Sequence, residues 1–136
     1  MKNIDAKGHV TGKSIYVDDI PTINGTLYGV IFDSPLAHGH IESVDYSKAL
    51  TLPGVITILT HEDIPGKNQI GGIIPDEELF ASKDVHFAGQ PIALIIAESN
   101  QIGFEARTLI DINILEKEVI VDPRQAQKNN QLILPP

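Results

Sequence analysis

The longest uninterrupted apolar run in the chain, I-A-L-I-I-A at residues 92–97, limits the possible folds more than any other segment. The run has the length of a β-strand and falls far short of the ~20 apolar residues that a membrane-spanning helix needs. Pro91 precedes it, at a strand start, where a missing backbone N–H does least harm. An entirely apolar strand is typical of the centre of a sheet with cover on both faces. We therefore predict a central, doubly covered strand.

Further strands and one main helix are indicated around this run. Apolar and β-branched residues predict strands over residues 27–32, 39–45, 55–59, 85–87 and 110–114. A helix is expected over residues 100–108, begun by Ser99. Gly103 inside it indicates a close backbone contact, because glycine there costs ~1 kcal/mol relative to alanine. The strands come in groups instead of alternating with helices, which predicts an α+β fold with a mixed sheet.

Short helical turns and one long loop complete the expected organisation. Turns are predicted after Ser47, Thr60 and Asp122, whose side chains can accept hydrogen bonds from free N–H groups. Residues 66–78, rich in glycine and acids, predict the longest irregular segment.

At 136 residues the chain fits one domain, which we place at residues 1–127. Residues 128–136 (K-N-N-Q-L-I-L-P-P) are interpreted as the start of a linker. Leu132 and Leu134 are expected to pack against something outside this chain.

Composition argues against several classes of function. The net charge is −8, and the few Lys and Arg residues form no basic stripe, so nucleic-acid binding is not expected. The absence of cysteine excludes disulfides, iron–sulfur ligation, thiolate zinc sites and cysteine nucleophiles within this chain. The first residues lack an apolar stretch of signal-peptide type, so the cytoplasm is the expected location, without membrane association.

Gly12-Lys13-Ser14 matches the end of the nucleotide-binding loop G-x-x-x-x-G-K-[ST]. The upstream glycine, Gly8, leaves three intervening residues where that loop has four. The following residues, I-Y-V-D-D-I-P, alternate β-branched with polar residues and end in proline, so they predict an extended segment. The loop needs a helix there to direct N–H groups at phosphate, so the nucleotide-site interpretation fails.

His38 and His40 are the only closely spaced histidines. Residues two apart on a strand share a face, so both rings could reach one metal ion. A closed site needs further ligands, and no His or acid follows at a suitable spacing. We therefore favour an interpretation in which one ring is packed and the other is solvated.

Two carboxylate clusters, Asp18-Asp19 and Asp76-Glu77-Glu78, are candidates for acid–base catalysis. Neighbours on a strand point to opposite faces, so the first pair cannot act on one substrate atom. The second cluster is interpreted as the first turn of a helix, where acids favour the helix dipole.

The serines lie in no G-x-S-x-G pattern, so a serine hydrolase is not supported. Gly89-Gln90-Pro91 is expected to position the central strand, with the Gln90 amide free to bind the backbone of a neighbouring domain.

Five phrases, in order along nearly the whole chain, resemble a known family. They are V-T-G-x-x-x-Y-x-D-D-I-P (10–21), S-P-L-A-H-G-H-I (34–41), A-L-T-L-P-G-V (49–55), P-D-E-E-L-F-A (75–81) and G-Q-P-I-A-L-I-I-A-E (89–98). Together they resemble the N-terminal α/β hammerhead domain of the large, molybdopterin-binding subunit of the xanthine dehydrogenase and aldehyde oxidase family, the molybdenum hydroxylases. At residues 115–118, L-E-K-E replaces the aromatic–Glu pair and Leu-Pro of that family, which affects local packing.

The resemblance implies an enzyme complex that hydroxylates purines, other N-heterocycles or aldehydes with oxygen from water. It implies a molybdenum–molybdopterin centre, 2Fe-2S clusters and FAD, all on other domains or subunits, which would be the partners of this chain. The family's catalytic residues belong to the domains that follow the hammerhead. No residue here, Gln90 included, is therefore assigned a catalytic, cofactor-binding or metal-binding role, and we expect a scaffold that is inactive alone.

The alternative is a free-standing, non-enzymatic binding or assembly module encoded by a split gene. Size-exclusion chromatography separates the two hypotheses. A self-sufficient module should behave as a clean monomer or a defined oligomer, whereas a severed domain should show an exposed apolar patch and concentration-dependent association.

Overall fold

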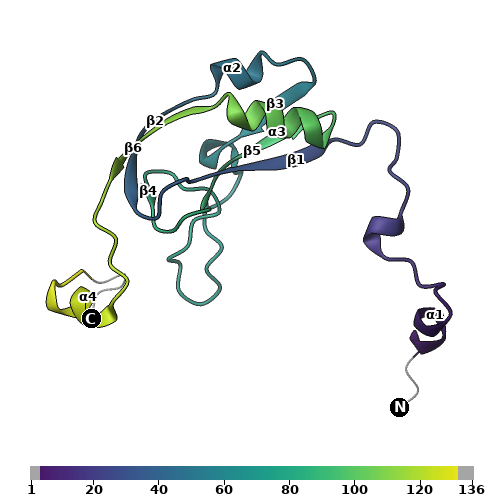
Figure 1. The fold of residues 1–136 in the computed structure, drawn as a ribbon, viewed down its shortest axis with the longest axis horizontal. Helices are drawn as coiled ribbons and strands as arrows, with labels where there is room; N and C mark the ends of the chain where they lie inside the picture. The colour runs from purple at the N-terminus through teal and green to yellow at the C-terminus, as the bar shows by residue number, and fades with distance from the viewer. Residues whose placement is uncertain (1–3, 132–136) are drawn as a thin grey trace.

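The computed structural model describes residues 4–131 and shows a sheet body with an arm extending from each end (Figure 1). The elements, in chain order, are α1 Ala6–Val10, the 3₁₀ helix η1 Val17–Asp19, β1 Tyr28–Asp33, β2 Gly39–Asp45, α2 Ser47–Leu50, β3 Val55–Leu59, the 3₁₀ helix η2 His61–Asp63, β4 Asp84–Val85, β5 Pro91–Ala97, α3 Asn100–Thr108, β6 Asp111–Glu116 and α4 Pro123–Lys128. One helix of nine residues and several short ones accompany the strands, so the predicted α+β fold is confirmed.

The strands form two three-stranded sheets, with orders β1-β5-β3 and β4-β2-β6. Every strand pair between residues 4 and 131 is antiparallel, so the predicted mixed sheet is wrong. The sequence shows where strands lie, but the partners are distant: Gly39 pairs with both Val85 and Glu116. Neither direction nor partner can be read from local patterns when pairs are this far apart.

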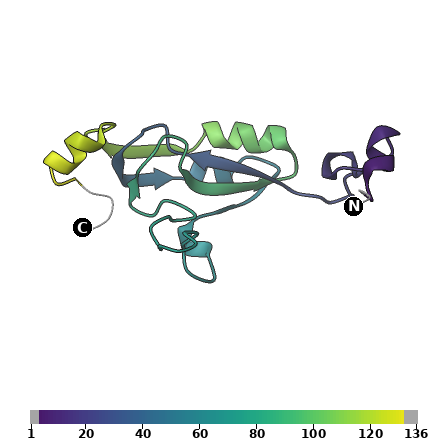
Figure 2. The same ribbon diagram turned by 90° about the horizontal axis from the view of Figure 1, so that it is seen from below.

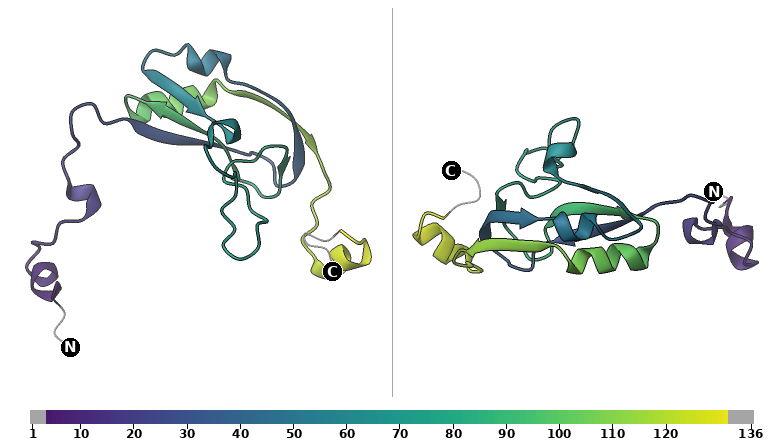
Figure 3. Two further views of the ribbon diagram at one scale, coloured as in Figure 1. Left: turned by 180° about the vertical axis from the view of Figure 1, so that it is seen from behind. Right: turned by 90° about the horizontal axis from the view of Figure 1, so that it is seen from above.

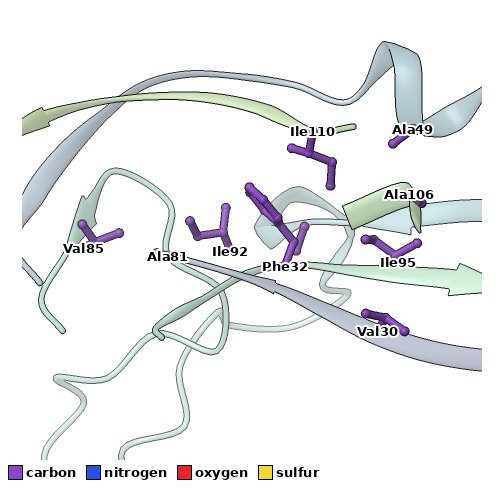
Figure 4. Close-up of a cluster of buried hydrophobic side chains, with 10 residues drawn as sticks. Val30, Phe32, Ala49, Ala81, Val85, Ile92, Ile95, Ala106 and Ile110 are labelled. Carbon is purple, nitrogen blue, oxygen red and sulfur yellow. The ribbon is translucent and has the colours of Figure 1, made fainter. Parts of the chain in front are cut away.

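Strand β5 is central, as predicted, and α3 packs on one face of its sheet. Val30 and Ile95, paired across β1 and β5, lie with Ala106 in the main core (Figure 4). A Cβ added at Gly103 would lie 2.5 Å from Val30 Cγ2, which confirms the close backbone contact predicted at this glycine. The packing of helix on sheet therefore leaves no room for a side chain at position 103.

The other face of this sheet is not covered by a helix. Figure 2 shows α3 on one side only, with the irregular 64–83 segment on the opposite side toward one end. Leu94 and Ile96 of β5 point to this second face and are partly exposed, and the neighbouring Ile31 is 47% exposed. The predicted cover on both sides of β5 is therefore wrong for this face of the described chain.

The predicted helix starts are largely confirmed. Ser99 Oγ accepts a hydrogen bond from Ile102 N (3.3 Å), and Thr60 and Asp63 form a reciprocal capping box. Asp122 Oδ1 accepts from Arg124 N (2.8 Å) at the start of α4. In contrast, Ser47 is the first residue of α2 and not its cap.

At the start of α2, the side chain that accepts the free N–H belongs to Asp45, whose Oδ1 lies 2.9 Å from Ser47 N. This backbone hydrogen bond holds the pKa of Asp45 below its ordinary value of 3.8.

Residues 66–78 contain no helix or strand, as predicted, and they belong to a longer irregular stretch between η2 and β4. The N-terminal arm, residues 4–27, contains α1 and η1, and η1 lies within the 15–21 segment that was predicted to be extended. Figure 3 shows that this arm runs away from the sheet body. The expected packing of Leu132 and Leu134 lies outside the residues that the structure describes, and the domain limit at residue 127 stays a prediction.

Candidate interaction surface

His38 and His40 engage different partners and do not converge. Nδ1 of His38 lies 2.8 Å from the Glu118 carbonyl oxygen, and Nδ1 of His40 lies 2.9 Å from Asp84 Oδ1. The His38 ring stacks on His86, with centroids 6.4 Å apart. Both rings of the pair are partly exposed, which corrects the expectation of one packed and one solvated ring. Within residues 4–131 no three His, Asp or Glu side chains are grouped so that they could hold a metal ion.

Asp84 contacts both Lys117 and His40, and no sequence pattern had grouped these three residues. Its Oδ1 accepts a hydrogen bond from Lys117 Nζ (2.6 Å) and contacts His40. The Lys117 hydrogen bond, followed by that of His40, holds the pKa of Asp84 below its ordinary value of 3.8. These partners are 33 and 44 residues away, so no spacing in the sequence could reveal them. All three side chains are about 40% exposed, which is typical of a surface ion network.

One carboxylate of each cluster, Asp19 and Glu78, stabilises local structure. Asp18 and Asp19 lie in the η1 turn, not on a strand, and Asp19 Oδ2 accepts from Tyr16 N (2.9 Å). Glu78 accepts from both Ser82 N (2.8 Å) and Ser82 Oγ (2.7 Å), in a segment without a helix. The predicted helix start at Asp76–Glu78 is therefore wrong, because Glu78 instead stabilises a loop through its hydrogen bonds with Ser82.

Gln90 is buried, with 3% of its surface exposed. The expected hydrogen bond from its amide to a neighbouring domain is therefore wrong. Its side-chain Oε1 accepts from His86 N (2.7 Å), and its backbone carbonyl accepts from Ser34 N (2.9 Å). Gly89 beside it has φ +85°, a conformation that L side chains rarely adopt. This tripeptide does position β5, but through contacts inside the chain.

One shallow, open hollow of about 400 Å³ lies beside the end of β1. The only charged residues in its described lining are Asp33 and Arg107, which neutralise each other in an ion pair of 2.5 Å. Ser34 in its wall uses its Oγ to contact Leu36 N and O. The described lining of the hollow thus contains no nucleophile–base pair.

We define the bare face as Gly29, Ile31, Thr57, Leu59, Leu94 and Ile96, the strand positions on the side of the sheet away from α3. The pairs Ile31–Leu94 and Gly29–Ile96, with Leu59–Leu94 and Thr57–Ile96, place these residues on one surface. None of the six carries a charge, and four of them are large and apolar. An uncharged, partly exposed sheet surface is typical of a contact with another protein or domain.

The arm exposes a second set of apolar side chains. Six large residues along it are between 59% and 84% exposed: Val10, Ile15, Tyr16, Val17, Ile20 and Ile23.

Comparison with known proteins finds relatives that share this architecture. The family model described as "Aldehyde oxidase and xanthine dehydrogenase, a/b hammerhead domain" matches residues 11–118. The chain is 41% identical over 126 residues to a xanthine dehydrogenase of Dictyostelium discoideum, covering 93% of this chain and 9% of that protein. It is 36% identical over 126 residues to a probable xanthine dehydrogenase subunit of Bacillus subtilis, covering 93% of this chain and 17% of the relative.

Solved structures agree with these relatives. The reconstituted CO dehydrogenase from Oligotropha carboxidovorans superposes with a TM-score of 0.80 at 31% identity, over 93% of this chain and 16% of that one. The aldehyde oxidoreductase from Desulfovibrio gigas gives a TM-score of 0.80 at 29% identity, over 90% and 15%. The chain therefore spans less than a fifth of the length of these relatives. No helix within residues 4–131 has the length and apolar character that crossing a bilayer requires.

Proposed function

Because the chain belongs to the aldehyde oxidase and xanthine dehydrogenase family of molybdenum hydroxylases, as its α/β hammerhead domain, we propose that it is a non-catalytic scaffold of such an enzyme. The assembled enzyme would act in the cytoplasm on purines, other N-heterocycles or aldehydes, adding oxygen taken from water. The observation that carries this proposal is the bare face of the sheet, an uncharged surface on which four of the six side chains are large and apolar.

The donor chemistry of this chain does not fit the cofactors of the family. Cysteine, which holds 2Fe-2S clusters, is absent from the sequence. The histidines and carboxylates of residues 4–131 form no group of three that could hold a metal ion. From the family, we propose that molybdenum–molybdopterin, 2Fe-2S clusters and FAD are held by other domains or subunits.

The partner proposed for the bare face is the molybdopterin-binding domain of the same enzyme. The relatives carry more than four fifths of their length outside the matched region, which is ample protein to cover it. The name of the Bacillus relative, which describes it as one subunit of a xanthine dehydrogenase, supports an assembly that also contains separate subunits. Covering Ile31, Leu94 and Ile96 removes apolar surface from water, at about 25 cal/mol per Å².

Co-expression of the tagged 136-residue chain with the molybdopterin-binding domains of the same enzyme tests this proposal. We expect the two to co-elute in size-exclusion chromatography with molybdenum in the complex. Ile31→Asp, in the bare face, should weaken the complex about tenfold or more, because a charge would be buried without a partner.

Phe104→Asp is the matched control, because Phe104 is 57% exposed on α3, at the opposite face of the sheet. Thermal unfolding of the isolated variants verifies that both fold. Failure of the wild-type chain to form a complex, or equal weakening by both variants, contradicts the assignment of the bare face.

A further inference from the structure

The N-terminal arm combines a defined local shape with a lack of burial. Between residues 4 and 27 no side chain is buried, and only Gly8 and Ser14 are partly so. Most of the exposed apolar positions of the arm fall within residues 10–23, where Ile15, Val17 and Ile23 are at least 77% exposed. In a hydrophobic core such side chains would be buried, whereas here they are exposed to solvent. Exposed apolar surface of this extent is characteristic of a binding element.

Local polar contacts fix the shape of this segment. Tyr16 Oη lies 3.1 Å from His9 Nδ1, and the two rings stack with centroids 6.0 Å apart. Tyr16 N donates to Asp19 Oδ2 (2.9 Å) while Asp19 N donates to the Tyr16 carbonyl (3.0 Å). Tyr16 thus connects α1 to the η1 turn, and the apolar residues on either side of it are held in a fixed arrangement.

Gly8 and Gly12 lie in the same turn. A Cβ at Gly8 would lie 2.8 Å from Ser14 Oγ, which could rotate away, and the Gly8 carbonyl accepts from Lys13 N (2.9 Å). Gly12 has φ +65°, which favours glycine because L side chains are strained there. The backbone therefore doubles back sharply between α1 and Ile15. Residues 8–23 are called the hook below.

We propose that the hook is a pre-shaped docking element, whose apolar side chains insert into an apolar surface of the molybdopterin-binding domain. This inference rests on the proposed function and adds a second contact, separate from the bare face. A segment already held in its bound shape loses less conformational freedom on docking than a flexible one. The polar contacts of Tyr16 thus contribute to assembly although they bury nothing in the chain itself.

Two observations favour this occupant. The family match begins at residue 11 and so includes most of the hook, in a family whose members are far longer than this chain. In Figure 1 the hook lies away from the sheet body, so the chain itself does not cover it. A second copy of the chain is the competing occupant, which the experiment identifies.

Amide hydrogen exchange, read by mass spectrometry, tests the hook directly. The isolated chain and its complex with the molybdopterin-binding domains are compared, and light scattering gives the mass of each sample. Exchange within residues 8–23 should be slower by about tenfold or more in the complex than in the isolated chain, because local opening becomes coupled to dissociation.

Equal exchange of the hook in the free chain and in a molybdenum-containing complex contradicts the proposed docking role of the hook and leaves the scaffold proposal intact. Absence of any complex overturns both. Protection of the hook in a homodimer of the 136-residue chain assigns it to a second copy and also overturns the inference.

Variants separate docking from folding. Ile15→Asp and Val17→Asp should each weaken the complex about tenfold or more, whereas Thr22→Asp places the same charge on the same arm without removing an apolar group. Tyr16→Phe keeps the ring and removes the hydroxyl, so it should weaken the complex by a few-fold only. Thermal unfolding of the isolated chain should be unchanged for all four. Equal weakening by Thr22→Asp and Ile15→Asp contradicts a specific apolar contact.

Discussion

In the sheet body, Ile95 and Val85 are fully buried and α3 closes over the strand that carries Ile95, whereas in the arm no side chain is buried between residues 4 and 27. The body is held together by apolar packing, and its register is set by that packing. The arm keeps its shape through short polar contacts around Tyr16 and leaves its apolar groups to water. Part of the family-specific sequence in this chain therefore does not stabilise the fold. The first family phrase, residues 10–21, lies in the arm, where no side chain is buried.

The largest effect on stability is expected in the centre of the body. Ile95→Ala removes buried methyl groups from a site with no exposed surface and should lower the free energy of unfolding by about 3 kcal/mol. Urea unfolding followed by circular dichroism measures this loss. A loss below about 1 kcal/mol would mean that the core closes around the change, and that packing does not distinguish body from arm.

A smaller effect is expected where helix meets sheet. Gly103→Ala gains helix propensity of about 1 kcal/mol but forces a Cβ against Val30, whose branched side chain is stiff. Overpacking of this kind costs about 1–3 kcal/mol, so we expect a net destabilisation of about 1 kcal/mol. Thermal unfolding provides the measurement, and a stabilised variant would show that α3 can move away from the sheet.

The surface network at Asp84 should contribute less, and only at suitable pH. Asp84→Asn removes the ion pair with Lys117 and should cost under about 1 kcal/mol at pH 7, because solvent screens these exposed groups. The pKa of Asp84 is depressed in the folded state, so its contribution is present above the ordinary value of 3.8 and is lost as pH falls through the folded-state pKa. Unfolding curves at pH 7 and at about pH 3 should therefore differ between wild type and variant more at pH 7. A stability difference between wild type and Asp84→Asn that is larger in acid than at pH 7 contradicts this expectation.

The smallest effect is expected in the arm. Ile15→Ala should leave the free energy of unfolding of the isolated chain within about 0.5 kcal/mol of wild type, because the side chain is 77% exposed. The same chemical change that costs most at Ile95 thus costs least here. Loss of more than about 1 kcal/mol would show that the arm packs on the body, and the contrast between the two regions would fail.

Local sequence patterns were sufficient for elements that depend on neighbours in the chain. The predicted strands at 39–45 and 55–59 and the helix at 100–108 have the observed bounds of β2, β3 and α3. Ser99 and Thr60 act as expected because a capping hydrogen bond spans only two or three residues. Patterns of this range are set by backbone geometry and not by tertiary contacts.

Long-range features could not be predicted. The division into two antiparallel sheets depends on pairings such as Gly39 with Glu116, and the Asp84 network depends on partners 33 and 44 residues away. The uniformly apolar sequence of β5 predicted that both faces of the strand are covered, but within the described chain a helix covers only one face. On our proposal, Leu94 and Ile96 are apolar because a partner covers the other face.

The central claim is that this chain binds within a molybdenum hydroxylase and does not hold its cofactor. The most direct measurement is the molybdenum and pterin content of the purified 136-residue chain, compared with that of the chain co-purified with the molybdopterin-binding domains. We expect stoichiometric molybdenum and pterin in the complex and only traces in the chain alone. One molybdenum and one pterin per isolated chain would contradict it.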